Sequence, residues 1–80
     1  MDDLTFDAHA LREMVRDSIS EDEVYHVIGD SDVDYELDTG RTRYERLMDD
    51  GRQIVVIVDW AISRVKTSWW DKRSGRRRRR

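Results

Sequence analysis

Apolar residues near the start of the chain recur at the spacing of an amphipathic helix. The pattern predicts a helix over Ala8–Arg16, and Asp7 or Thr5 can accept backbone N–H groups at its first turn. The predicted buried face is formed by Ala8, Leu11, Met14 and Val15.

A second helix is indicated by its start signal. Ser20 and Glu23 have the spacing of a capping box, in which each side chain bonds the backbone N–H of the other residue. Ile19 and Val24 flank the cap at the spacing of a hydrophobic staple. The buried stripe is expected to comprise Val24, Val27 and Ile28, and Gly29 is expected to stop the helix.

The hydrophobic period then changes from that of a helix to two. Apolar and acidic residues alternate over 33–38, and further strands are predicted over 41–48, 53–58 and 62–70. A short strand over 4–6 is compatible with the same pattern. The chain is therefore expected to be one α+β domain over 1–70, with two N-terminal helices packed on one face of a four-stranded antiparallel β-meander. Residues 71–80 are expected to form a disordered basic tail.

The turns predict which side chains share a face of the sheet. Two-residue loops at Thr39-Gly40 and Asp50-Gly51, with a three-residue loop over 59–61, set the expected register. In that register the helices cover the face that carries Val33, Tyr35, Leu37, Tyr44, Met48, Val55, Ile57, Val65 and Trp69. The opposite face carries Ile54, Val56, Val58 and Ile62, surrounded by Arg41, Arg43, Arg64 and Lys66, with Asp34, Glu36 and Asp38 along the edge.

This basic face with an apolar floor is expected to stay open, because two helices cannot cover both sides of a sheet. Exposed apolar patches mark partner or ligand surfaces, and basic residues suit a phosphate backbone. The alternative is that Asp38–Arg41 and Glu36–Arg43 are ordinary cross-strand pairs, worth about 0.2–1 kcal/mol each. Arg64 and Lys66 have no such partner in the expected register.

Charge is distributed unevenly along the chain. Residues 1–40 hold thirteen acidic and two basic residues, whereas residues 41–80 hold five acidic and thirteen basic residues. The two halves either neutralise each other across the fold or leave a basic surface for an acidic partner. The 80-residue chain has no cysteine, no membrane-length apolar run and no signal-peptide pattern, so disulfides and a membrane span are not expected and the cytoplasm is the expected location.

Several segments, spread over roughly 5–70, together form a pattern that is shared with a known family. They are His9-Ala10-Leu11, Met14, Arg16, Ile19-Ser20-Glu21-Asp22-Glu23-Val24, Gly40-Arg41-Thr42-Arg43-Tyr44, the apolar segment 54–58 and Val65-Lys66-Thr67. With these segments the chain resembles a widespread small bacterial domain of unknown function that is related to the RelE and BrnT toxins. Asp17-Ser18 stands where the family usually has a single glycine. The resemblance implies a RelE-like fold with a basic concave face, metal-independent cleavage of mRNA, often on the ribosome, and silencing by a cognate antitoxin.

RNA cleavage needs a base for the ribose 2′-hydroxyl and cations for the charge that develops at phosphorus. Arg41, Arg43, Arg64 and Lys66 are the candidate cations, and His9 is the candidate base because histidine titrates near neutral pH. His26 is a weaker candidate on the second helix. Tyr44 is expected to pack in the core.

The end of the chain supplies candidate RNA-binding residues. Trp70 can stack on a base, and Arg76, Arg77 and Arg78 belong to a run of five arginines that is either native or an added polyarginine handle. With two distant histidines and no cysteine, neither a metal site nor a cofactor is expected.

The leading hypothesis is a toxin-like protein that acts on RNA as a metal-independent ribonuclease, with RNA or the ribosome and an antitoxin-like protein as partners. The alternative is a small non-enzymatic module that binds a protein or a nucleic acid through the sheet face. A third possibility is the accessory half of a two-protein system, without RNA contact.

Overall fold

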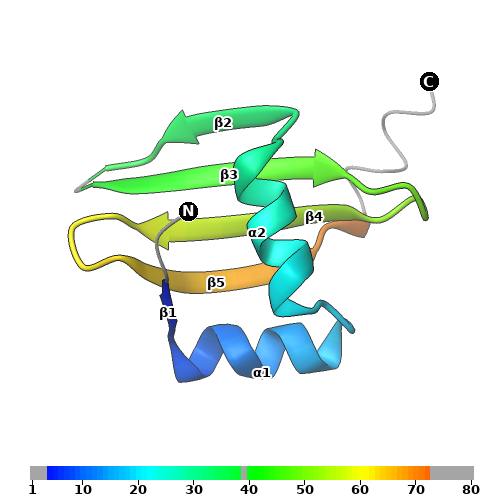
Figure 1. Cartoon of the computed structure of the whole chain (residues 1–80), viewed down its shortest axis with the longest axis horizontal. Coiled ribbons are helices and arrows are strands. Elements are labelled where there is room, and N and C mark those ends of the chain that lie inside the picture. Colours follow the sequence, from blue (N-terminus) through cyan, green and yellow to red (C-terminus); the bar gives the residue numbers. More distant parts are fainter. Residues whose placement is uncertain (1–3, 39, 73–80) are drawn as a thin grey trace.

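Five strands form one sheet in the order β1-β5-β4-β3-β2 in the computed structural model, which describes residues 4–38 and 40–72 (Figure 1). Two helices accompany the sheet. The elements, in chain order, are β1 Thr5–Phe6, α1 Ala8–Arg16, α2 Glu21–Gly29, β2 Val33–Glu36, β3 Arg41–Leu47, β4 Gln53–Asp59 and β5 Arg64–Trp70.

The predicted four-stranded antiparallel meander is wrong, because β1 joins the sheet as a fifth strand, parallel to β5. The N–H of Thr5 donates to the Ser63 carbonyl at 3.0 Å, and the N–H of Asp7 donates to the Val65 carbonyl at 3.0 Å. The short strand expected over 4–6 is present as β1, but its pairing with the sheet gave no signal in the sequence because its partner lies nearly sixty positions away. The α+β class holds, but the sheet is mixed.

The two helices do not share one face of the sheet. Figure 1 shows α2 crossing in front of the strands, whereas α1 runs along the edge of the sheet beside β5. At that edge α1 buries only Ala10 and Met14, and the predicted face residues Leu11 and Val15 are 41% and 81% exposed. A helix at an edge meets the core along a narrower stripe than a helix lying across a face.

The start of α2 is confirmed in detail. The N–H of Glu23 donates to Oγ of Ser20 at 3.1 Å, and the N–H of Ser20 donates to Oε1 of Glu23 at 3.0 Å, which completes the capping box. Ile19 and Val24 are both buried. Gly29 is the last residue of the helix, and Asp30 caps it.

Each hairpin loop is one residue longer than the sequence suggested. Between β3 and β4 the N–H of Met48 donates to the Arg52 carbonyl, and Gly51 adopts a left-handed φ of 94°. This is a three-residue loop with glycine at its left-handed position, so Arg43 lies opposite Ile57 and not Val58. Between β2 and β3 the N–H of Leu37 donates to the Arg41 carbonyl at 2.8 Å, which gives the same shift.

The shifted register exchanges the two predicted faces for most apolar residues, because side chains alternate along a strand. α2 covers the face that carries Tyr44, Ile54, Val56, Val58, Val65 and Ser68, which we call the covered face. The loop between β4 and β5 is also longer than expected, since β5 begins at Arg64 and leaves Ile62 in the turn, 55% exposed. A bulge between Ile57 and Val58 then places both Val58 and Val65 in the core.

Candidate functional site

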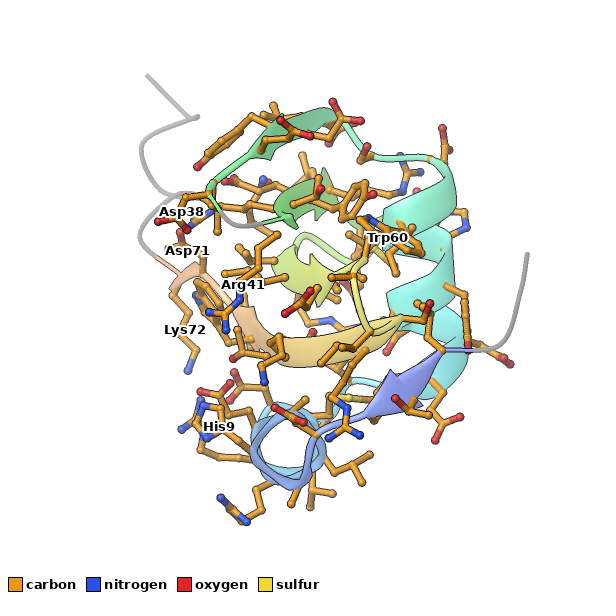
Figure 2. The ribbon with its side chains drawn as sticks, turned by 90° about the vertical axis from the view of Figure 1, so that its left-hand side faces the viewer. His9, Asp38, Arg41, Trp60, Asp71 and Lys72 are labelled. Atoms are coloured by element: carbon orange, nitrogen blue, oxygen red, sulfur yellow. The ribbon has the colours of Figure 1, made fainter. Side chains whose placement is uncertain are left out.

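The side of the sheet away from α2 carries two of the residues predicted to be functional, Arg41 and Arg43. We call it the open face, and its strand positions are Val33, Tyr35, Arg41, Arg43, Glu45, Leu47, Val55, Ile57, Thr67 and Trp69. Figure 2 shows Arg41 and Lys72 on this side, opposite α2, with His9 below them on α1. The sequence therefore placed Arg41 and Arg43 on the correct side, but their apolar neighbours are Val55, Ile57 and Trp69.

The two β3 arginines of the open face both contact acidic side chains. Nε of Arg41 lies 3.6 Å from a carboxylate oxygen of Asp59, on the neighbouring strand. Nε of Arg43 donates to Glu45 at 2.8 Å, and its guanidinium lies 5.3 Å from the centre of the Trp69 ring. These contacts replace the predicted pairs with Asp38 and Glu36, because the register differs by one residue.

Arg64 and Lys66, which were expected to have no partner, share Asp7. A guanidinium nitrogen of Arg64 donates to Asp7 at 2.8 Å, and Nζ of Lys66 lies 2.9 Å from its other oxygen. The hydrogen bonds from Arg64 and from Lys66 hold the pKa of the Asp7 carboxyl below its ordinary value. The Asp7 side chain makes no cap bond to α1, so its role is to pair these cations. Sequence spacing gave no signal for this contact, which depends on the parallel pairing of β1 with β5.

His9 belongs to a separate cluster at the side of α1. Its Nε2 lies 3.4 Å from Glu13, and Glu13 also accepts a hydrogen bond from the Thr67 hydroxyl on β5. The carboxylate stands between the imidazole and the hydroxyl, so the imidazole is not placed to activate that hydroxyl. Of the predicted catalytic residues, Arg64 and Lys66 meet at Asp7, whereas His9, Arg41 and Arg43 each contact a different acid.

Acid is expected to weaken the fold through Asp7. Because folding lowers the pKa of this carboxyl below its ordinary value of 3.8, its stabilising contribution is present above that value and is lost as the pH falls through the folded-state pKa. Between about pH 6 and about pH 3, the free energy of unfolding, measured by urea denaturation, should therefore fall less for Asp7→Asn than for the unmodified protein. Asp49→Asn, in the exposed β3–β4 loop, is the control. Parallel pH profiles for Asp7→Asn and the unmodified protein would contradict this role of Asp7.

A groove of about 430 Å³ contains the predicted stacking residue Trp70. It is lined by Arg16, Asp17, Ser18, Asp50, Arg52, Trp70 and Lys72. Nζ of Lys72 lies 4.8 Å from the centre of the Trp70 ring, and the Trp70 N–H donates to Asp17 at 3.0 Å. Burial raises the pKa of the Asp17 carboxyl, but hydrogen bonds from Arg16 and from the Trp70 N–H outweigh burial, so this pKa is lowered overall. The pKa of the Asp50 carboxyl is also lowered, mainly by the hydrogen bond from the Arg52 N–H. Both carboxylates are therefore charged at neutral pH and offset part of the charge of the three cations in the groove, Arg16, Arg52 and Lys72.

Strand β2 and Leu37, the residue directly after it, present large apolar side chains to solvent. Val33, Tyr35 and Leu37 are 45%, 46% and 43% exposed, and we call these three residues the β2 stripe. Leu47 lies on the same side at the end of β3 and is 37% exposed. The sequence pattern identified these β2 residues as one face of a strand but assigned them to the core.

Other predictions have separate outcomes. Arg76, Arg77 and Arg78, with the rest of 73–80, lie outside the described residues, as does Thr39 of the predicted turn. Tyr44 packs against the core as expected, and its hydroxyl accepts a hydrogen bond from Trp60 at 3.0 Å.

Within 4–38 and 40–72, no cluster of three or more potential metal-ligating side chains is found, and neither helix there has the length and apolar character needed to cross a membrane.

Comparisons of the chain with protein-family models, with curated proteins and with solved structures found no match.

Proposed function

We propose that the protein is a small non-enzymatic module whose open face binds a protein partner. The observation that carries this proposal is the β2 stripe, whose three neighbouring apolar side chains are each more than 40% exposed on an uncovered face. Apolar surface that clusters on one side of a small domain is typical of interaction sites. Tyrosine is also enriched at protein interfaces, because its ring packs against apolar groups while its hydroxyl can form a hydrogen bond.

The charges of the open face and of the β1–β5 edge favour a protein over a polyanion. Arg41, Arg43, Arg64 and Lys66 each contact a carboxylate, so this surface offers few cations for phosphate groups. Binding to nucleic acid takes much of its free energy from cations that neutralise phosphates. A nearly neutral face with an apolar border is instead typical of the centre of a protein interface.

Random peptides displayed on phage and selected against the purified protein would test this proposal. We expect selected peptides to lose about tenfold or more in affinity for Tyr35→Asp, because a carboxylate in the stripe must be desolvated on binding. Val15→Asp is the matched control, since Val15 is an apolar residue of α1 that is 81% exposed and remote from the stripe. Peptides that bind Tyr35→Asp as well as the unmodified protein, or a selection that enriches no binder, would contradict the proposal.

RNA cleavage, with the toxin-like relation that suggested it, stays a prediction. Incubating the purified protein with RNA in EDTA, with and without ribosomes, tests it directly. Cleavage products that disappear in Arg64→Ala would support an enzymatic function and would make protein binding secondary.

A further inference from the structure

We infer that the partner contributes a β-strand that pairs with the free edge of β2, and that basic and apolar residues alternate along that strand. This inference rests on the proposed function and specifies the occupant of the same surface. Three observations support it: the backbone of β2 has a free edge, one face of the strand is apolar while the other is acidic, and a second copy of the chain fits this edge poorly.

The backbone of β2 has a free side. β2 is the last strand of the sheet and pairs only with β3, and the described residues include no other strand at its outer edge. The Leu37 N–H donates inward to Arg41 at 2.8 Å, and inward and outward groups alternate along an antiparallel strand. The N–H and C=O groups of Asp34 and Glu36 therefore point outward. Such groups form a template for an added strand.

The two faces of β2 differ in chemistry. The β2 stripe lies on the open face, whereas Asp34 and Glu36 lie opposite Tyr44 and Thr42, on the side of α2. Asp34 and Glu36 are exposed, and neither has a cationic partner among the described residues, in contrast to Asp32, which contacts Arg46. An added strand would therefore meet apolar side chains on one face and unpaired carboxylates on the other.

A second copy of the chain fits this edge poorly. If two β2 strands pair antiparallel with their faces matched, even-numbered residues must oppose even-numbered residues. Those positions are Asp32, Asp34, Glu36 and Asp38, so every such register places carboxylates opposite carboxylates. Like charges directly opposite each other destabilise a sheet. Asp34 and Glu36 attract instead a strand with lysine or arginine at alternate positions, and apolar residues between them would contact the stripe.

A synthetic peptide that alternates lysine and valine is the probe. We expect it to bind the full-length protein with an affinity that falls as salt is raised, because the lysines pair with exposed carboxylates. The Asp34→Lys, Glu36→Lys double variant should lose about tenfold in affinity for this peptide and should gain affinity for the matching peptide of glutamate and valine. A peptide of the same composition with its lysines contiguous is the control and should bind more weakly than the alternating one.

The results separate this inference from the proposed function. If phage-selected peptides depend on Tyr35 but the charge exchange changes no affinity, the strand-pairing inference is overturned and binding at the open face stands. If neither peptide class depends on Tyr35, both fall. Concentration-dependent dimerisation that Tyr35→Asp abolishes would identify a second copy as the occupant and overturn the inference.

Discussion

Val56→Asp is expected to unfold most of the protein, whereas Ile57→Asp is expected to leave it folded. Val56 is fully buried on the covered face, where the described residues offer an aspartate no cation. An unpaired buried charge costs several kcal/mol, against a total stability of about 4–12 kcal/mol for a chain of this length. Ile57 lies on the open face, half-buried and opposite Arg43, so an aspartate there keeps access to water and gains a cationic neighbour.

Circular dichroism and amide dispersion in NMR spectra of the two variants provide the comparison. The register with two-residue loops predicts the opposite ranking, because it places Ile57 beneath the helices and Val56 on the open side. A folded Val56→Asp together with an unfolded Ile57→Asp would therefore contradict the assignment of faces on which the proposed function depends.

Arg52→Ala is expected to lower the free energy of unfolding by about 2–3 kcal/mol. The Arg52 side chain is 14% exposed, donates to the Ser18 carbonyl at 3.1 Å and to Asp50 at 2.8 Å, and also bonds Glu23. It thus joins the turn between the helices, the first turn of α2 and the β3–β4 loop. Ser18 has a φ of 58°, in the left-handed region that suits glycine, so this turn depends on contacts from outside it.

Thermal unfolding checks the role of Arg52. A loss of this size should lower the melting temperature by about 10–20 °C. Arg12→Ala is the matched control, because Arg12 is exposed on α1 and has no polar partner among the described residues, and it should lie within about 0.5 kcal/mol of the unmodified protein. Equal stability of Arg52→Ala and Arg12→Ala would show that the three contacts of Arg52 contribute little.

Local signals predicted the elements of this fold well. The 3.6-residue spacing located α1, and the Ser20–Glu23 capping box located the start of α2, because both depend on residues within a few positions of one another. The long strands were also recognised. Aspartate-glycine and threonine-glycine sequences indicated turns but did not distinguish a two-residue loop from a three-residue loop with glycine at its end.

This one-residue difference in loop length determined which side chains share a face of the sheet and, with that, the surroundings of the candidate site. The contacts of Asp7 with Arg64 and Lys66 join the two ends of the described chain, and no local pattern encodes them. The position of α1 at the β5 edge also follows from the β1–β5 pairing. The candidate arginines were found as residue types, but the acids that neutralise them depend on tertiary structure.

Amide hydrogen exchange along β2 tests the central claim most directly. In the free protein the N–H groups of Asp34 and Glu36 should exchange rapidly and those of Tyr35 and Leu37 slowly, because only the latter point toward β3. Saturation with a phage-selected peptide should slow Asp34 and Glu36 as an added strand accepts their hydrogen bonds. Rapid exchange at both residues in the saturated complex, or slow exchange already in the free protein, would contradict a free edge that receives a partner strand.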